Sequence, residues 1–379
     1  MTNLLALPAG TELVGDFRIK KVLGAGGFGI TYLADEIALA RQVTIKEYFP
    51  ADFAARDKGK DAKARSRECA ADYKWGLERF IEEAQTLARF DHPNIVRVYR
   101  YFRANNTGYM VLQFEEGKSF KGWLKGLGRA PRQNELDDLL RPLLDALEKI
   151  HDRDFLHRDI APDNIMVRKD KSPVLIDFGS ARGEIVSHSR TVSALVKPGY
   201  SPYEQYASTT RQQGPWTDIY ALGATFYQAV TGKRPPDAPS RMVNDDYIPA
   251  RQAALGTYRP AFLAAIDRAL RLEISERPQS IADWRRQLLE PEVVAAAPPK
   301  AKTSRVKLAG FLKGGATPTE VLETQNADAA PYNAAGAAAP RCPSRRRDRR
   351  SCAPPQRCAL GDKARAAAFG LLRCSRRSA

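Results

Sequence analysis

The sequence H-R-D-I-A-P-D-N at residues 157–164 is the most informative stretch of this chain, and D-F-G follows it at residues 177–179. The apolar run V-L-I directly before D-F-G predicts a short strand that ends at Asp177. Asp159 and Asp177 contribute carboxylates, and Asn164 contributes an amide.

A glycine-rich segment near the N-terminus, G-A-G-G-F-G at residues 24–29, matches the pattern G-x-G-x-x-G. A dinucleotide-binding fold would require a helix directly after these glycines. Here the next residues, I-T-Y-L-A at 30–34, are mostly β-branched or aromatic and predict a strand. The segment is therefore expected to be the turn of a hairpin, whose backbone N–H groups can lie over phosphates. A plain glycine-rich turn is the alternative at this stage.

A lysine on the next predicted strand, Lys46 in V-T-I-K, requires an acidic partner if it is buried. The following helix has apolar positions at Leu77, Phe80, Ile81, Ala84, Leu87 and Ala88. Glu83 falls on this apolar stripe, whereas Glu82 falls on the polar face. Since an unpaired buried carboxylate is costly, Glu83 is predicted to pair with Lys46.

These segments occur in the order and spacing of the signatures of the protein-kinase superfamily, which the chain resembles over residues 14–290. G-F-G-I-T-Y, I-K-E-Y-F-P and H-R-D-I-A-P-D-N are similar to bacterial, eukaryotic-like serine/threonine protein kinases. The resemblance implies an α+β, bilobal protein-kinase fold. Its smaller lobe would be β-rich with one key helix, at about residues 16–114, and its larger lobe would be mainly helical, at about 115–290.

The resemblance also implies the site. The catalytic residues would be Asp159, Lys46, Glu83 and Asn164, with Asp159 acting on the acceptor hydroxyl. ATP would be held by Leu23, Gly24, Ala25, Gly26, Gly27, Phe28, Gly29, Ile30, Thr31, Lys46, Gln113 and Glu115. The last two belong to a hinge that would bind adenine through backbone groups. Mg²⁺ would be held by Asn164 and Asp177. His157 and Phe178 would be packing elements that position Asp177.

Three further residues match structural positions of that family. Glu204, in P-Y-E, would pair with the distant Arg277. Asp218, on a predicted buried helix that ends at Gly232, would brace the catalytic loop. All three lie in strongly apolar surroundings, which favours paired burial over exposure.

The sequence departs from the family pattern close to Asp159. Ala161 stands where serine/threonine kinases usually have a lysine that touches the γ-phosphate. Lys197 stands where a threonine often braces the catalytic aspartate. Thr31 and Thr44 occupy the positions of the usual valine and alanine beside adenine, and residues 48–76 form a long charged insertion. Ala161 in place of the lysine removes a positive charge from the transition state. The rate of phosphate transfer and the preferred acceptor hydroxyl are therefore open.

The C-terminal segment differs from the rest of the chain. Residues 341–379 contain twelve Lys or Arg against two Asp, which leaves only +6 of the net charge of +16 for the first 340 residues. Residues 291–379 are rich in Ala, Pro and Arg, which predicts a low-complexity basic tail. This tail is expected to contact nucleic acid or an acidic membrane surface weakly, to serve as a tether or docking segment, or to be an out-of-frame terminus. The spacing of its four cysteines, with no C-x-x-C and no nearby His, does not fit a zinc site. A disulfide framework does not fit the cytoplasmic location that is expected for the chain.

The chain is therefore expected to be a lead-in at 1–15, a kinase domain at 16–290 and the tail. Without a signal peptide or a long apolar run, a cytoplasmic location is expected. The leading function is an ATP- and Mg²⁺-dependent serine/threonine kinase with a protein substrate and self-phosphorylation in trans. Candidate modification sites are Ser187, Ser189, Thr191 and Ser193. The alternatives are a nucleotide-binding pseudokinase scaffold and a small-molecule phosphotransferase.

Overall fold

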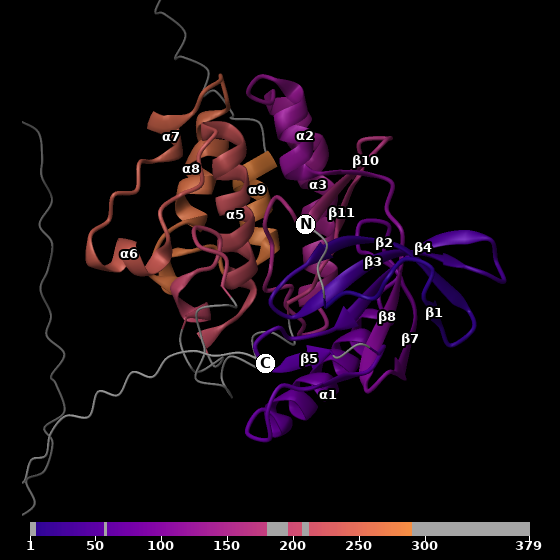
Figure 1. The fold of residues 1–379 in the computed structure, drawn as a ribbon. Coiled ribbons are helices and arrows are strands. Elements are labelled where there is room, and N and C mark those ends of the chain that lie inside the picture. The colour runs from indigo at the N-terminus through magenta and orange to yellow at the C-terminus, as the bar shows by residue number, and fades with distance from the viewer. Residues whose placement is uncertain (1–4, 57–58, 180–195, 207–211, 290–379) are drawn as a thin grey trace, which may run out of the picture. The chain divides into compact units, whose positions relative to one another are not determined.

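The computed structural model of the protein describes residues 5–56, 59–179, 196–206 and 212–289. These residues form a sheet-rich N-terminal lobe and a mainly helical C-terminal lobe, as the resemblance implied (Figure 1). The four candidate modification sites and the basic tail lie outside the described residues.

The N-terminal lobe is built on a six-stranded antiparallel sheet in the order β1-β2-β3-β4-β8-β7. Its strands are β1 (Glu12–Leu13), β2 (Phe17–Ala25), β3 (Gly29–Glu36), β4 (Arg41–Tyr48), β7 (Val98–Ala104) and β8 (Thr107–Gln113). On β4, Lys46 lies opposite Thr31 of β3 and Met110 of β8. Since alternate residues of a strand share a face, Lys46 and Thr44 point to the same side of the sheet.

One long helix, α1 (Ala70–Leu87), packs against this sheet and begins inside the predicted insertion. The contact with β8 is close, because a Cβ placed on Gly108 would lie 3.0 Å from Leu77 and 3.1 Å from Ile81. The predicted orientation of the helix is confirmed: the side chain of Glu83 is 3% exposed, whereas that of Glu82 is 51% exposed and pairs with Arg79.

A buried carboxylate, Glu47, ties the insertion to the sheet. Its side chain is fully buried and pairs with Arg56 (Oε1–Nη2 2.5 Å) on β5 (Ala54–Arg56), which forms a hairpin with β6 (Ala62–Ala64). The hydroxyls of Tyr32 and Tyr109 donate to Glu47 over 2.7 and 2.8 Å. Arg56 also donates from Nε to the carbonyl of Leu5 over 2.8 Å. The network therefore also fixes the segment that precedes β1.

The C-terminal lobe contains a three-stranded sheet and a set of packed helices. The strands are β9 (Gly117–Ser119), β10 (Ile165–Arg168) and β11 (Pro173–Leu175), in the order β11-β10-β9. The helices and 3-10 turns are α2 (Phe120–Leu127), α3 (Gln133–His151), η1 (Tyr203–Gln205), α5 (Pro215–Thr231), α6 (Ala238–Val243), α7 (Ala250–Ala253), α8 (Pro260–Ala269), η3 (Ile274–Glu276) and α9 (Ile281–Leu289). The apolar residues of α3 recur at three- and four-residue steps, from Leu136 to Ile150, and are buried.

The predicted buried helix is α5, and Gly232 follows it with φ 73°, a left-handed conformation that glycine adopts at low cost. Beside it, the guanidinium of Arg277 donates to Glu204 (Nη1–Oε1 2.7 Å), and both side chains are fully buried. This confirms the predicted ion pair, which joins η1 to the segment after η3.

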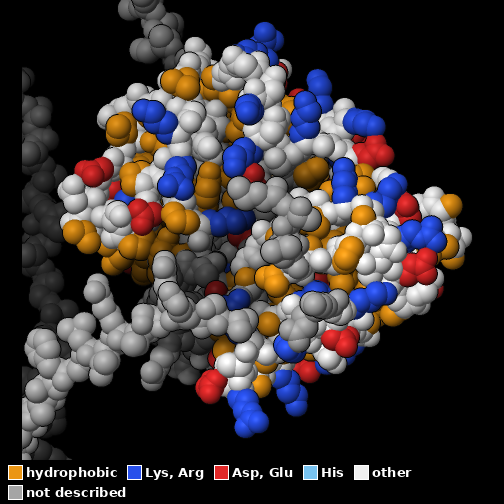
Figure 2. Space-filling model, viewed as in Figure 1, with side chains coloured by type: hydrophobic (Ala, Val, Ile, Leu, Met, Phe, Trp, Pro, Cys, Tyr) orange, Lys and Arg blue, Asp and Glu red, His pale blue; other side chains and the backbone are white. Residues whose placement is uncertain are grey.

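The charged surface of the two lobes is mixed. Figure 2 shows Lys and Arg side chains spread over the visible face, with Asp and Glu between them. None of the helices in the described part of the chain is both long and apolar enough to span a bilayer.

Candidate active site

The catalytic loop places Asp159 and Asn164 side by side between α3 and β10. The amide nitrogen Nδ2 of Asn164 donates to Asp159 Oδ2 over 2.7 Å and to the Asp159 carbonyl over 2.8 Å. Asp159 is 7% exposed and Asn164 is 5% exposed. Because the amide nitrogen is used in this way, the amide oxygen is the atom of Asn164 that can serve a cation.

The backbone of this loop is held by Asp218 on α5. The N–H groups of His157 and Arg158 both donate to the Asp218 carboxylate over 2.8 Å, and His151 Nε2 lies 2.9 Å from it. Arg158 has φ 63°, a conformation that a non-glycine residue keeps only when its surroundings enforce it. Burial by itself would raise the pKa of Asp218, but the His151 contact and these donors outweigh it and lower that pKa. The carboxylate therefore stays charged and fixes the loop.

The D-F-G segment packs onto the same loop. Phe178 is 1% exposed and stacks on His157, with ring centroids 4.2 Å apart. The N–H of Gly179 donates to the His157 carbonyl over 2.9 Å, and a Cβ on Gly179 would lie 2.9 Å from the Cβ of Asp159. These contacts hold Asp177, whose φ is 58°, beside the catalytic loop.

We predict that His157 stays neutral in the folded protein down to about pH 4. Burial lowers its pKa from 6.5 to about 4, and the nearby Asp218 and Asp159 carboxylates only partly offset this. The unfolded chain therefore takes up the proton first as the pH falls. Stability from this group is complete above pH ~6.5 and decreases by about 3 kcal/mol as the pH falls towards 4.

NMR titration of the histidine ring carbons measures this directly, with the His157 signal assigned by its loss in His157→Tyr. The tyrosine ring preserves the stacking on Phe178. A midpoint near that of a histidine-containing peptide in the same buffer would contradict the prediction.

Lys46 connects the two lobes at the site. Its ammonium Nζ lies 3.1 Å from Asp177 Oδ1 and 3.9 Å from Glu83 Oε1, and it is 3.5 Å from the Phe178 carbonyl. The structure thus brings the predicted Lys46 and Glu83 together, with Asp177 as the nearer partner. In this arrangement the lysine, the helix glutamate and the D-F-G carboxylate form one cluster.

Two adjoining cavities lie between the lobes, and both include Gly24, Thr31 and Asp177. The polar one, of about 320 Å³, is lined by Gly24, Ala25, Gly26, Gly27, Phe28, Gly29, Thr31, Lys46, Asp159, Asn164, Asp177, Val196 and Lys197. The more apolar one, of about 390 Å³, is lined by Leu23, Gly24, Thr31, Thr44, Val96, Leu112, Gln113, Phe114, Glu115, Gly117, Met166, Ile176 and Asp177. Their linings suit a molecule with an apolar end and a polar, charged end.

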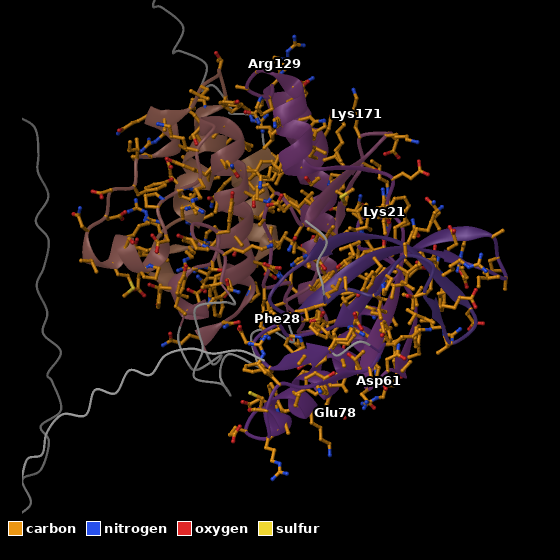
Figure 3. The ribbon with its side chains drawn as sticks, in the orientation of Figure 1. Lys21, Phe28, Asp61, Glu78, Arg129 and Lys171 are labelled. Atoms are coloured by element: carbon orange, nitrogen blue, oxygen red, sulfur yellow. The ribbon has the colours of Figure 1, made fainter. Side chains whose placement is uncertain are left out.

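The glycine turn covers the polar cavity. Phe28 lies at its tip (Figure 3), and its carbonyl accepts from the N–H of Phe49 over 3.0 Å. A Cβ on Gly24 or Gly26 would meet nothing within 4 Å, whereas one on Gly29 would clash with the Glu47 carbonyl at 2.3 Å. Gly29 is therefore required by packing, while Gly24 and Gly26 leave open space beside the turn.

Comparison with known proteins agrees with this geometry. A model of the protein kinase domain family matches residues 17–258. The chain belongs to the protein kinase family.

Its relatives are bacterial serine/threonine kinases. The chain is 33% identical over 272 residues to serine/threonine-protein kinase PknA of Nostoc sp., covering 69% of this chain and 44% of that protein. It is 33% identical over 280 residues to serine/threonine-protein kinase C of Synechocystis sp., covering 69% of this chain and 47% of that protein. A solved structure described as the apo form of PpkA-294 is 39% identical, with a TM-score of 0.65 over 75% of this chain and 99% of that one. The chain spans less than half the length of the two curated relatives.

The kinase hinge corresponds to the end of β8 and the residues after it. Gln113 and Glu115 both line the apolar cavity. The N–H of Gln113 donates to the Arg97 carbonyl over 2.9 Å, so this group is already used within the protein. The Glu115 carboxylate pairs with Arg168 (Oε2–Nε 2.6 Å). Because its side chain is used in this way, Glu115 can serve the cavity through its backbone.

Two predicted site residues do not line either cavity. Ile30 is 2% exposed and lies in the hydrophobic core. Glu83 is buried, 3% exposed, and faces the site from behind Lys46, with which it pairs. Conversely, sequence reasoning missed the apolar lining residues Val96, Met166 and Ile176. Met166 lies two residues after Asn164, and Ile176 directly precedes Asp177. This closeness in sequence to the predicted site residues could have identified both as lining residues.

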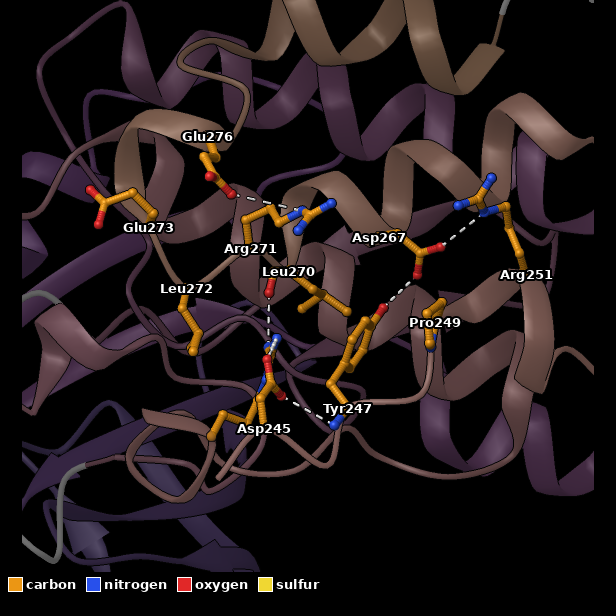
Figure 4. A pocket seen from close by; sticks show the side chains of 11 residues that line it. Asp245, Tyr247, Pro249, Arg251, Asp267, Leu270, Arg271, Leu272, Glu273 and Glu276 are labelled. Atoms are coloured by element: carbon orange, nitrogen blue, oxygen red, sulfur yellow. Dashed lines mark hydrogen bonds and ion pairs between the residues drawn. The ribbon is translucent and has the colours of Figure 1, made fainter. Parts of the chain in front are cut away.

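A third cavity, of about 330 Å³, lies within the C-terminal lobe (Figure 4). Its charged side chains pair with one another: Arg241 with Asp245 at 2.8 Å, and Arg251 with Asp267 at 3.7 Å. Tyr247 donates from its hydroxyl to Asp267 over 2.6 Å. Because these groups pair largely within the lobe and none belongs to the glycine turn or the catalytic loop, we assign this cavity to the packing between α6, α7 and α8.

Proposed function

We propose that this chain is an ATP-dependent serine/threonine protein kinase of bacterial signalling. The observation that carries the proposal is the polar cavity, where the glycine turn, Lys46, Asp159, Asn164 and Asp177 meet. Adenine would occupy the adjoining apolar cavity against the backbone of Gln113 and Glu115. The triphosphate would then extend under the glycine turn towards Asp159, with Lys46 at the α- and β-phosphates.

The reaction follows from this placement. The oxygen of a protein hydroxyl forms a bond to the γ-phosphorus, and the bond from that phosphorus to the β–γ bridging oxygen breaks, leaving its electron pair on ADP. Asp159 orients the hydroxyl and accepts its proton. The transition state is loose, so positioning and neutralisation of charge account for most of the rate enhancement.

The chain offers a fitting place for Mg²⁺. The Asp177 side chain is 32% exposed towards the cavity, and the amide oxygen of Asn164 is on the side opposite its bonds to Asp159. Bound there, the cation would neutralise the phosphates. The groups of three or more His, Cys, Asp or Glu that bind other metals do not occur among the described residues.

Further parts of the proposal come from the sequence. We take residues 16–290 as the kinase domain, with protein hydroxyls as acceptors and self-phosphorylation in trans as a route of activation. Pro162 favours serine or threonine as acceptor. A cytoplasmic location and weak contacts of the basic tail with nucleic acid or acidic membranes also remain predictions.

The test is incubation of the purified full chain with γ-labelled ATP and Mg²⁺, alone and with a generic acceptor protein such as casein. We expect phosphoserine and phosphothreonine in the chain or the acceptor, and no incorporation when EDTA removes the cation. Nucleotide binding without transfer would support the pseudokinase instead. Consumption of ATP without any phosphoprotein, in the presence of small hydroxyl compounds, would support the small-molecule phosphotransferase.

A further inference from the structure

The departure at position 197 has a specific place in the structure. The ammonium Nζ of Lys197 lies 2.9 Å from Asp159 Oδ1, on the carboxylate oxygen that Asn164 does not use. Its side chain is 32% exposed and lines the polar cavity together with the glycine turn and Lys46. Lys197 is thus a cation at the catalytic carboxylate.

The backbone of Lys197 is held firmly. Its N–H donates to Ser201 Oγ over 3.1 Å, and its carbonyl accepts from the N–H groups of Tyr200 and Ser201 over 2.9 Å. Within this turn Gly199 has φ 84°, and a Cβ there would lie 2.7 Å from the Pro235 carbonyl. The Tyr200 hydroxyl donates to Gln228 of α5 over 2.5 Å. The lysine is therefore presented by a turn docked on α5, which reduces the entropy lost when its side chain binds a ligand.

The charges in the polar cavity leave a role for this ammonium. Among the described residues that line it, Lys46 and Lys197 carry the positive charges, and Asp159 and Asp177 carry negative ones. Lys46 is engaged with Asp177 and Glu83. The catalytic loop itself offers only the buried methyl group of Ala161 two residues after Asp159. Among the described lining residues, Lys197 is therefore the one that brings a positively charged side chain to Asp159, where the phosphoryl group is transferred.

We propose that Lys197 binds the γ-phosphoryl group of ATP and neutralises its charge during transfer, from the activation segment instead of from the catalytic loop. The inference rests on the proposed kinase function. An ammonium has three N–H donors. One points to Asp159, and the ammonium has two more that can donate to phosphate oxygens as the bond to the acceptor oxygen forms and the bond to ADP breaks. The simpler alternative is a structural ion pair that only orients Asp159.

Nucleotide affinity separates the two roles. Affinities for ADP and for a non-hydrolysable ATP analogue are measured by calorimetry with Mg²⁺, for the wild-type chain, Lys197→Met, Lys197→Arg and the exposed control Lys125→Met on α2. For Lys197→Met we expect about tenfold weaker binding of the ATP analogue and less than about twofold change for ADP, because only the triphosphate carries the group that Lys197 contacts. Lys197→Arg and the control should resemble the wild type.

Equal losses for both nucleotides, or no loss for either, would overturn the proposal. If Lys197→Met does not fold, Lys197→Gln provides the same comparison, since its amide can still donate to Asp159. The measurement does not depend on turnover. A wild-type chain that transfers no phosphate would therefore refute the proposed function while Lys197 is still tested.

Relocation of the charge provides a second test. We expect Lys197→Met to lower kcat by about 10²-fold with little change in the KM for the acceptor, as loss of one charge-stabilising donor does elsewhere. Adding Ala161→Lys to Lys197→Met should recover about tenfold of this loss, because the second lysine returns a cation to the same cavity. No recovery in a folded double variant would favour the structural ion pair.

Discussion

Asp159→Asn is expected to lower kcat for phosphate transfer by about 10²- to 10⁴-fold, the range over which general acid–base groups act. The amide retains the size of the carboxylate and can still accept from Asn164, but it can neither take up the acceptor proton nor pair with the Lys197 ammonium 2.9 Å away. Nucleotide binding should be largely preserved, because Asp159 acts on the acceptor. Initial rates with γ-labelled ATP and calorimetry with ADP measure the two quantities.

Asp163→Asn is the matched control. Asp163 lies four residues further along the same loop, but its side chain is 58% exposed and pairs only with the exposed Lys121 at 3.2 Å. An exposed pair of this kind contributes little, so the control should retain wild-type activity within about a factor of two. Equal rates for Asp159→Asn and the wild type would show that the transfer does not use this carboxylate.

Arg277→Leu is expected to lower the free energy of unfolding by about 3–5 kcal/mol, because it leaves the Glu204 carboxylate buried without its counter-charge. Both side chains are fully buried, and Arg277 also donates to the carbonyls of Arg271 and Leu272 over 2.7 and 2.8 Å. Thr217, which donates to Glu204 over 3.0 Å, cannot replace a cation. Urea denaturation followed by circular dichroism measures the change.

The neighbouring Arg271 provides the control. Its side chain is 63% exposed and lies 3.9 Å from Glu276, so Arg271→Leu should cost less than about 1 kcal/mol. The double variant Glu204→Gln/Arg277→Leu should be less destabilised than the sum of its single variants, since no buried charge remains. A loss below about 1 kcal/mol for Arg277→Leu would mean that the pair contributes little to folding.

The fold and much of the candidate site could be predicted because their signals are local. Periodicity alone separated Glu83 from Glu82, since a helix turns neighbouring residues to different faces. The residues after the glycines established a hairpin in place of a strand–helix turn. The resemblance of H-R-D-I-A-P-D-N and D-F-G to kinase motifs implied that Asp159, Asn164 and Asp177 belong to one site. In the structure, a short hairpin of β10 and β11 is all that separates the two segments.

Contacts between distant segments were less accessible. The buried Glu47 network joins residues from the lead-in, the insertion and two strands, and nothing in the sequence around Glu47 signals its tyrosine partners. The distances from the Lys46 ammonium to Asp177 and to Glu83 differ by less than 1 Å. Which carboxylate is nearer therefore depends on how α1 and the D-F-G segment pack, and the sequence does not specify this.

Asp159 and Lys197 illustrate the division between sequence and structure in this protein. The sequence by itself predicted, through its resemblance to protein kinases, that a carboxylate, an amide and a second carboxylate belong together under a glycine turn, because those residues lie in short motifs with strong local geometry. It also showed that the catalytic loop has Ala161 in place of a lysine. The resemblance to kinases already placed position 197, 38 positions after Asp159, beside the catalytic aspartate. Only the tertiary structure decided that the Lys197 ammonium contacts Oδ1 of Asp159, at 2.9 Å. The physical reason is that this contact depends on the docking of residues 197–201 against α5, which no local pattern encodes.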